Sequence, residues 1–363
     1  MAPQLISVIG CLHVDCIMMT DRIPDRGESY KARQYHEGLG GKGANAAIAS
    51  YRSCHAQPPE GRLASLDDRI DSSNEDEIEV CMIGAVGNDK YAQLFEDALQ
   101  ENGIDVSGLQ KVDGMTGKSF VQVEIASGEN RCTFANNAND ALTAEYFTKL
   151  ESLANGRQPD LVIAQMEIDR AVVEQIIATA GEAGIEVLIN AAPANHILSR
   201  YYRHITHLLV NETEAATMSG REIEEVNEET WQEIAEDFLE KGVKNVVLTL
   251  GAQGAFYGTA DEFGHVPAFD VNVVDCTGAG RVSMDTFTGA YATDYLRQKQ
   301  RGQWDIREAV VRACKAAALT ITRIGAQEGI PWMDAIDDFQ ENESPQVAVE
   351  AASPSATDAS EEL

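Results

Sequence analysis

Three short segments of the chain combine residue types that could do chemistry. Residues 38–45 read GLGGKGAN, residues 274–280 read VDCTGAG with Asp285 shortly after, and residues 211–214 read NETE. Free backbone N–H groups at a glycine-rich helix start can hold a phosphoryl group, and a nearby carboxylate can accept the proton of an attacking hydroxyl. Together these residue types indicate phosphoryl transfer.

The first glycine segment contains a formal G-x-G-x-x-G pattern, which is typical of dinucleotide sites. The polar residues 34–37 precede it, so no clean apolar strand leads into the turn. Because Gly43 follows Lys42 where a P-loop has Ser or Thr, the segment is not a P-loop either. The apolar pattern that follows predicts a helix starting near Gly41. Its glycines would allow either close approach of a small polar ligand or close helix packing alone.

The other two segments also have simpler interpretations. Gly278, Ala279 and Gly280 could form an anion hole, with Asp285 as the first carboxylate inside the following helix. A plain helix cap and turn explains this pattern equally well. Residues 211–214 follow an apolar run, where amide and carboxylate oxygens suit a hydrated Mg²⁺. Acidic residues at a helix N-terminus are the other explanation.

Short apolar runs alternate with amphipathic stretches along most of the chain. This alternation predicts an α/β protein with a mostly parallel sheet covered by helices on both faces, and ligands beyond the carboxyl ends of the strands. The expected strands are 5–10, 78–84, 160–164, 186–190, 207–210 and 245–250, and the expected helices include 90–100, 170–183 and 229–240.

Two regions interrupt the alternation and predict a small separate sheet. Residues 16–37 and 118–134 are extended in pattern, so we expect a lid formed from about 12–38 and 115–136. We expect a disordered acidic loop insertion over 55–77 and a disordered acidic tail over 341–363. The remaining chain, 1–340, is predicted to be one domain.

Composition limits the partners and the compartment. The 363 residues include 28 Lys and Arg against 59 Asp and Glu, a net charge of −31, which disfavours nucleic acid and anionic membranes as partners. The seven cysteines form no Cys-x-x-Cys pair and no His/Cys cluster in the sequence, so reduced thiols without a zinc site are expected. No signal peptide or apolar run of about 18 residues is evident, and we expect a cytoplasmic protein, with the nucleus as a second compartment.

The ordered set of motifs resembles the phosphofructokinase-B-type carbohydrate kinase family, and within it the ribokinase-like members. The resemblance extends from about residue 5 to 340 and implies a ribokinase-like three-layer sandwich with a small β lid. The matching stretches are 40–45, 165–167, 190–194, 211–215, 249–251, 275–280, 285–287, 322–327 and 331–332.

The resemblance also implies roles for individual residues. Asp285 would be the catalytic base beside the anion hole of Gly278, Ala279 and Gly280. The sugar would be held by His13, Asp15, Gly41, Lys42, Asn45 and Glu167. The nucleotide and its Mg²⁺ would lie near Asn211, Glu214, Thr249, Gly251, Gly254 and Cys314. A monovalent cation, usually K⁺, would be held by Asp275, Thr277, Thr320, Arg323 and Gly325.

The implied reaction converts ATP and D-ribose to ADP and D-ribose 5-phosphate, a step of D-ribose catabolism. The lid often forms a homodimer contact in such proteins. Another sugar or a nucleoside is the nearest alternative substrate, and a ligand-binding protein without catalysis is a different class. A nicotinamide-dependent oxidoreductase, suggested by G-x-G-x-x-G alone, lacks the strand that this motif requires.

The sequence departs from the family pattern in two places. His13 stands where ribokinases usually have Asn. The glycine motif usually runs directly into the catalytic Asp, but here four residues, RVSM at 281–284, separate Gly280 from Asp285. Four residues would shift Asp285 by about 6 Å if the helix simply lengthened, which would put it out of reach of the sugar. Three explanations are open: an error in the gene model, which we favour, a real insertion that inactivates the protein, or a real insertion that is tolerated.

Overall fold

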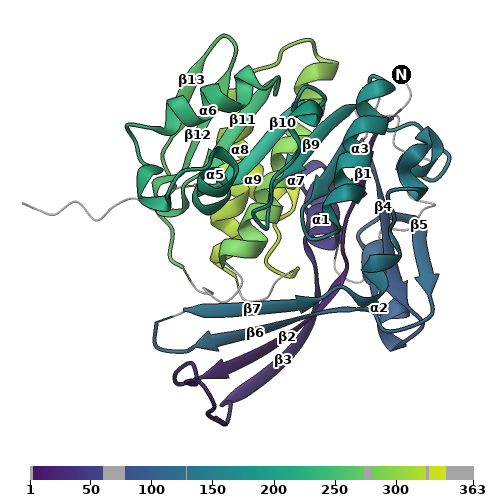
Figure 1. Ribbon diagram of the computed structural model, residues 1–363, viewed down its shortest axis with the longest axis vertical. Helices are drawn as coiled ribbons and strands as arrows, with labels where there is room; N and C mark the ends of the chain where they lie inside the picture. Colours follow the sequence, from purple (N-terminus) through teal and green to yellow (C-terminus); the bar gives the residue numbers. More distant parts are fainter. Residues whose placement is uncertain (1–2, 60–77, 128, 274–278, 324–326, 341–363) are drawn as a thin grey trace, which may run out of the picture.

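The computed structural model describes residues 3–59, 78–127, 129–273, 279–323 and 327–340. Most of the acidic insertion and the whole acidic tail predicted from the sequence lie outside these residues. The described part consists of a large body and a small sheet that projects from it (Figure 1). Within it, no helix is both long enough and apolar enough to cross a bilayer.

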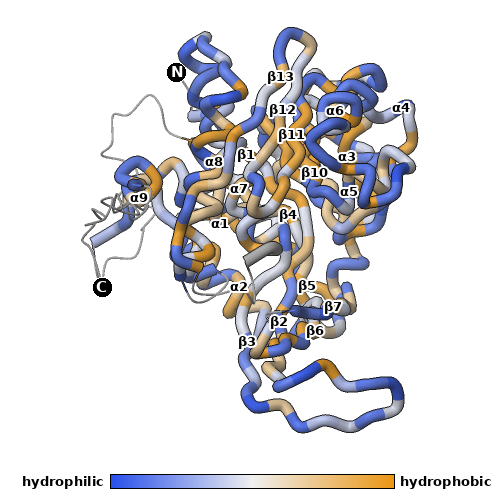
Figure 2. The backbone as a smooth tube through the Cα atoms, turned by 90° about the vertical axis from the view of Figure 1, so that its left-hand side faces the viewer, coloured by the Kyte–Doolittle hydropathy of each residue, from blue (hydrophilic) through white to orange (hydrophobic). Residues whose placement is uncertain are grey.

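The body is built on a nine-stranded sheet in the order β13-β12-β11-β10-β9-β8-β1-β4-β5. The strands from β11 to β5 are parallel, and β12 and β13 add an antiparallel edge. Their apolar runs are buried, as expected for a sheet covered on both faces (Figure 2). The strands are β1 Gln4–Ile9, β4 Ile78–Gly87, β5 Asp105–Val112, β8 Leu161–Gln165, β9 Glu186–Asn190, β10 His207–Asn211, β11 Asn245–Thr249, β12 Ala255–Thr259 and β13 Phe263–Val266.

Helices cover both faces of this sheet and create two apolar cores. One core lies under α1, α2, α7, α8 and α9, and the other under α3 to α6. The helices are α1 Lys42–Cys54, α2 Lys90–Glu101, α3 Arg170–Glu182, α4 Ser199–Tyr202, α5 Glu212–Ser219, α6 Trp231–Glu240, α7 Ala279–Gln300, α8 Ile306–Ile321 and α9 Met333–Asp337. Short 3₁₀ turns are η2 Asn137–Ala141, η3 Tyr146–Thr148, η4 Leu150–Leu153, η5 Ile223–Glu225 and η6 Gly251–Gln253.

The small sheet has four strands in the order β3-β2-β6-β7. The strands are β2 His13–Thr20, β3 Gln34–Gly40, β6 Gly117–Glu124 and β7 Asn130–Ala135, with β2 and β6 parallel and the other pairs antiparallel. Because β2 directly follows β1 and β3 leads into α1, this sheet is anchored beside the N-terminus of α1 (Figure 1).

The predicted fold class is confirmed, with one correction at the first glycine segment. A strand does precede it, namely β3, but this strand is mostly exposed to solvent. Its polar sequence therefore gave no apolar strand signal. The predicted helix begins where expected, with Gly41 as its N-cap and Lys42 as its first residue.

Candidate active site

The buried carboxylate of Asp285 lies between two residues of the first glycine segment. Asn45 Nδ2 donates a 3.1 Å hydrogen bond to Asp285 Oδ2, and Lys42 Nζ lies 3.6 Å from Asp285 Oδ1. Asp285 is 1% exposed and Lys42 is 7% exposed. The structure thus brings together the predicted base and two predicted sugar ligands, although they are far apart in the sequence.

Gln327 orients Asn45 within this cluster. Its Nε2 donates to Asn45 Oδ1 over 3.3 Å, which directs the Asn45 amide nitrogen toward Asp285. Arg52 of α1 holds the same C-terminal segment, because its guanidinium donates to the carbonyl oxygens of Gln327 and Ile330 over 2.8 and 2.9 Å. Sequence reasoning assigned no role to Gln327, although it lies in a stretch that carried the family resemblance.

Gly41 allows the β1–β2 connection to pass directly under the start of α1. Its φ of 93° lies in the left-handed region, and an added Cβ would come within 2.6 Å of His13 N and 2.8 Å of Cys11 O. Only glycine fits both the conformation and the space. This contact places residues 11–13 beside Lys42 and Asn45.

Glu167, just after β8, contacts the β1–β2 connection from the side opposite Gly41. Its Oε2 accepts hydrogen bonds from Lys42 N over 3.1 Å and from Cys11 Sγ over 2.5 Å, and it lies 3.6 Å from His13 Nδ1. Burial raises the pKa of the Cys11 thiol well above its usual range, and the Glu167 charge adds to this effect. Cys11 is another residue that sequence reasoning did not assign to the site.

Asp15 enters from the small sheet. It lies on β2, where Ser119 of β6 donates a hydrogen bond to its Oδ1. The aromatic ring of Phe134 on β7 lies 5.6 Å from the ring of His13. The predicted sugar ligands thus come from β2, from α1 and its N-cap, and from the residue segment after β8.

A cleft of about 730 Å³ lies beyond the ends of β10 and β11 and is lined by Ser283, Met284 and Phe287, the neighbours of Asp285 on α7. Five of the six predicted nucleotide residues line it, namely Asn211, Thr249, Gly251, Gly254 and Cys314. Apolar side chains such as Phe269, Val273 and Ala317 form much of the rest, which suits a flat aromatic base. Burial raises the pKa of the Cys314 thiol to about 12, so this wall of the cleft stays uncharged.

The sixth nucleotide residue, Glu214, lies behind the cleft. It forms a capping box with Asn211: Glu214 Oε2 accepts from Asn211 N over 2.7 Å, and Asn211 Oδ1 accepts from Glu214 N over 2.8 Å. Burial raises the pKa of the Glu214 carboxyl despite these hydrogen bonds. Glu214 therefore fixes the start of α5, while the side chain of Asn211 lies at the cleft.

The insertion extends α7 at its N-terminal end. Helix α7 begins at Ala279, so Gly280 lies five residues, about 7.5 Å along the axis, before Asp285. The register of the following turns is held by close packing: a Cβ on Gly289 would meet Ser50 N of α1 at 2.4 Å, and Thr288 accepts from Asn190 over 3.1 Å. The expectation that a lengthened helix carries Asp285 away from the sugar ligands is therefore wrong.

The inserted residues instead change the wall of the cleft. Ser283 and Met284 both line it, and Thr249 Oγ1 lies 3.5 Å from Met284 Sδ. Val282 is buried. The extra turn thus separates the glycine motif from Asp285 and places the Met284 thioether beside the cleft residue Thr249.

The predicted monovalent-cation site is only partly described. Asp275, Thr277 and Gly325 lie outside the described residues, as does Gly278 of the anion hole. Thr320 is buried, and its hydroxyl contacts Thr286 Oγ1 at 3.1 Å and donates to Ala316 O over 2.9 Å. Arg323 is exposed.

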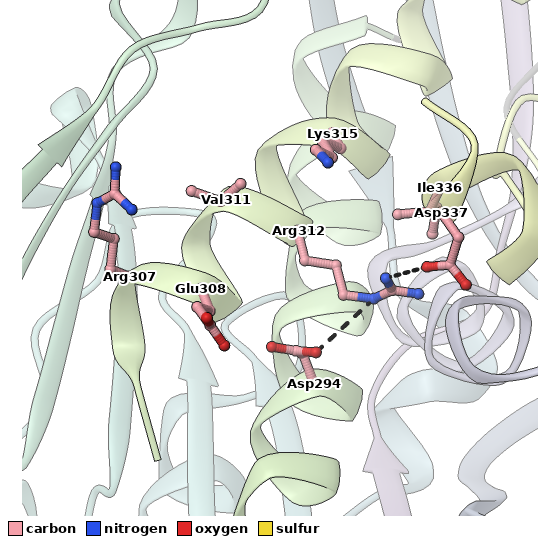
Figure 3. A pocket seen from close by; sticks show the side chains of 8 residues that line it. All are labelled: Asp294, Arg307, Glu308, Val311, Arg312, Lys315, Ile336 and Asp337. Carbon is pink, nitrogen blue, oxygen red and sulfur yellow. Dashed lines mark hydrogen bonds and ion pairs between the residues drawn. The ribbon is translucent and has the colours of Figure 1, made fainter. Parts of the chain in front are cut away.

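A second pocket lies among α7, α8 and α9, and none of its lining residues is a predicted site residue (Figure 3). Arg312 forms an ion pair with Asp337 in this pocket, and its Nε lies 4.0 Å from Asp294 Oδ1. Charges of both signs line this pocket, and Arg312 pairs with both Asp294 and Asp337. It gives no indication of a substrate site.

The fold, the buried Asp285 carboxylate beside Lys42 and Asn45, and the nearby cleft of nucleotide size are features expected of a phosphotransferase of the sugar-kinase class. A family model described as pfkB family carbohydrate kinase matches residues 3–333. The chain belongs to this family, as the motifs predicted, and it is a kinase.

Curated relatives agree with this family. Ribokinase of Schizosaccharomyces pombe is 31% identical over 92% of this chain and 96% of its own length. Deoxyribokinase of Salmonella typhi is 30% identical over 92% and 98%. A bifunctional ribokinase/ribose-5-phosphate isomerase A of Fructilactobacillus sanfranciscensis is 31% identical over 91% of this chain, which spans only 55% of that longer protein.

A solved structure supports the same fold. The crystal structure of a ribokinase from Thermotoga maritima superposes with a TM-score of 0.70 at 28% identity, covering 92% of this chain and 98% of that one. The predicted ribokinase-like sandwich is thereby confirmed.

Proposed function

We propose that this kinase transfers the γ-phosphoryl group of ATP to the primary hydroxyl of D-ribose, giving ADP and D-ribose 5-phosphate. The observation that carries the proposal is the buried Asp285 beside Lys42 and Asn45, with its α7 neighbours Met284 and Phe287 lining a cleft of nucleotide size. A base, hydroxyl-binding groups and a nucleotide cleft in one place are the parts that phosphoryl transfer to an alcohol needs.

The sugar-binding set supports a small polyhydroxylated substrate. Asp15, Lys42 and Asn45 offer a carboxylate, an ammonium and an amide, which together can accept from and donate to several hydroxyl groups. Glu167 adds a second carboxylate from the facing side. The ribokinase and deoxyribokinase relatives both support a pentose, and they leave 2-deoxyribose as the nearest alternative sugar.

In the proposed mechanism Asp285 accepts the proton of the primary hydroxyl as its oxygen attacks the γ-phosphorus in line. The bond to the β–γ bridging oxygen breaks, and ADP leaves. Lys42 Nζ, 3.6 Å from Asp285 Oδ1, adds positive charge near the base and the incoming phosphoryl group. Asn45 holds the carboxylate in position.

ATP and Mg²⁺ are the proposed nucleotide and divalent cation. Asn211 and Glu212, at the start of α5, line the cleft, and the Glu212 carboxylate is of the ligand type that Mg²⁺ prefers, so the residues present fit a water-bound ion. Mg²⁺ supplies charge neutralisation on the phosphates. For K⁺ the support is the family pattern, with Asp275, Thr277, Thr320, Arg323 and Gly325 as the proposed surroundings.

The small sheet is the proposed lid of a single kinase domain that ends near residue 340. It carries Asp15 and the Phe134 ring toward the site, so its closure would exclude water from the reaction. Tyr35 on the edge strand β3 and Phe120 on the inner strand β6, 56% and 43% exposed, support the proposed homodimer contact. The proposed location is the cytoplasm, with the nucleus as a second compartment.

A second candidate function is binding of sugar and ATP with little turnover. The observation that favours it is the separation between Gly280 and Asp285, about 6 Å longer than the family pattern gives. Because misplacement by 1 Å can cost on the order of a hundredfold in rate, this extra turn could abolish catalysis while both ligands still bind.

The test is ADP release by the full chain with ATP, Mg²⁺, K⁺ and D-ribose, beside a variant lacking residues 281–284. Product analysis should identify D-ribose 5-phosphate, and 2-deoxyribose and nucleosides serve as competing substrates. Turnover by both proteins would support ribokinase activity with a tolerated insertion. Turnover by the deletion variant alone would support the binding protein. No turnover of ribose by either, with turnover of another substrate, would overturn the substrate assignment.

A further inference from the structure

Three buried side chains around the β1–β2 connection form a group of metal-ligand type. Cys11, His13 and Glu167 are 0%, 0% and 3% exposed, and one ligand atom from each lies within 4.8 Å of the other two. Tetrahedral zinc bonds of 2.0–2.3 Å place ligand atoms about 3.3–3.8 Å apart. The separation between His13 Nδ1 and Glu167 Oε2, 3.6 Å, already falls in this range.

The hydrogen bonds of Asn136 fix which histidine nitrogen is available. Asn136 Nδ2 donates to Glu167 O over 3.2 Å, so its Oδ1 is the acceptor that faces His13 Nε2 at 3.3 Å. His13 Nε2 must therefore carry the proton. In the neutral ring the lone pair is then on Nδ1, which is buried and has no hydrogen-bond partner among the described residues.

This arrangement is the usual outer support of a metal-binding histidine, whose second nitrogen donates to a carbonyl-type oxygen. Glu167 has a comparable support, since Lys42 N donates to its Oε2 over 3.1 Å. Asn139 holds the β1–β2 connection itself: it accepts from Leu12 N and donates to Leu12 O, both over 3.0 Å. The three ligand residues are thus held in place before any ion binds.

We propose that Cys11 Sγ, His13 Nδ1 and Glu167 form a zinc-binding site with an open fourth position. A thiolate, an imidazole and a carboxylate are the ligands that Zn²⁺ takes, and the thiolate disfavours Mg²⁺. The ion replaces the proton of the Cys11 thiol, which is released to solvent. Two anionic ligands balance its charge within the buried site.

The zinc site has a consequence that rests on the proposed function. Glu167 is one of the proposed sugar ligands, and a metal bound to its carboxylate withdraws it from the sugar. Zn²⁺ and D-ribose should therefore exclude one another. Micromolar zinc would act as a reversible inhibitor that competes with the sugar and not with ATP.

The direct test is Co²⁺ titration of the reduced, metal-free full chain, followed by absorption spectroscopy. A thiolate-to-cobalt charge-transfer band in the near ultraviolet, with one equivalent bound and displaced by Zn²⁺, is expected. Cys11→Ser should abolish the band, and His13→Gln should weaken binding at least tenfold. Asn136→Leu should weaken binding by about 10–100-fold through loss of the outer support.

The matched control is Cys132→Ser, which removes a more accessible thiol on β7 and should leave the titration unchanged. Thermal unfolding of each variant checks that the fold is retained. A band that survives Cys11→Ser, or one that disappears in Cys132→Ser, would overturn the site. Absence of any band in the unaltered chain would overturn it as well.

Competition between Co²⁺ and D-ribose tests the zinc site separately from the proposed kinase function. The cobalt band is measured without ATP and does not depend on turnover. If D-ribose reduces cobalt affinity, both assignments are supported. If cobalt binds but ribose has no effect on it, the zinc site stands and the assignment of Glu167 to the sugar fails. If ribose is phosphorylated but no cobalt binds, the kinase stands and the zinc site fails.

Discussion

Asn45 of α1 donates a 3.1 Å hydrogen bond to the carboxylate of Asp285 of α7, across 240 positions of sequence. The two helices pack closely enough that Gly289 cannot accept a Cβ without meeting α1 backbone. This packing fixes the position of Asp285 along the α7 axis, beside the predicted sugar ligands, independently of the residues that precede it. The four-residue insertion therefore separates Gly280 from Asp285 along α7 and leaves Asp285, the proposed base, beside Lys42 and Asn45.

Replacing the proposed base should remove activity and preserve the fold. Asp285→Asn keeps the size of the side chain but cannot accept the hydroxyl proton, so kcat should fall by on the order of 10²–10⁴ with little change in the KM for ribose. Steady-state kinetics of ADP release measures this. Asp294→Asn, on the same helix but near the protein surface, is the control and should be close to normal. Equal loss in both variants would contradict a specific role for Asp285.

Gln327 should act as a positioning residue. Gln327→Leu removes the donor that orients Asn45, so Asp285 would lose a fixed partner, and kcat should fall on the order of tenfold while the KM for ATP stays constant. The pH–rate profile should also shift, since the environment of Asp285 changes. Glu328→Gln, at the neighbouring exposed position, should have no effect. An unchanged kcat in Gln327→Leu would rule this role out.

Comparing Gly41→Ala with Gly27→Ala tests the close contact between the β1–β2 connection and the start of α1. Both have positive φ, 93° and 81°, but an added Cβ meets backbone atoms at Gly41 and nothing within 4 Å at Gly27. Each Gly→Ala change should lower the free energy of unfolding by about 1–2 kcal/mol through backbone conformation. Gly41→Ala should cost about 1–3 kcal/mol more through overpacking and should also weaken ribose binding. Denaturant titration and ribose binding measure the two effects, and equal losses would contradict the close contact.

His207 should make the fold sensitive to acid. It is fully buried at the start of β10, where its Nδ1 lies 2.9 Å from Tyr291 Oη, and burial lowers its pKa to about 3. The unfolded chain binds a proton near pH 6.5 and the folded protein does not, so stability is full above about pH 6.5 and falls as the pH drops toward 3. The slope from this group should be at most about 1.4 kcal/mol per pH unit.

The measurement is the free energy of unfolding between pH 4 and 7. His207→Asn keeps a polar partner for Tyr291 and cannot titrate, so its curve should be flatter than that of the unaltered chain. His36→Asn, at an exposed position on β3, should leave the slope unchanged. A slope that His207→Asn does not reduce would show that other groups cause the acid sensitivity.

Much of the body could be predicted from local sequence. The buried strands β8 to β11 are short apolar runs, and each predicted start or end lies within one residue of the observed one. The motif segments likewise lie at the ends of these strands or at helix starts. These features depend on neighbours within a few residues, which is why a linear pattern reveals them.

Other features depend on contacts between residues that are far apart in the sequence. The mostly exposed strand β3 has no apolar pattern, and Gln327 reaches Asn45 only because the C-terminal segment folds back over α1. The sequence showed no cysteine–histidine cluster, since Glu167 joins Cys11 and His13 only through the pairing of β1 with β8.

Local sequence patterns predicted the family, the order of strands and helices, and the residue types available for phosphoryl transfer. The place of the insertion and the contacts between distant side chains depend on tertiary packing, because packing between α1 and α7, whose residues are distant in sequence, sets the helix register. The added turn therefore extends α7 at its N-terminal end, and Asp285 remains beside Lys42 and Asn45.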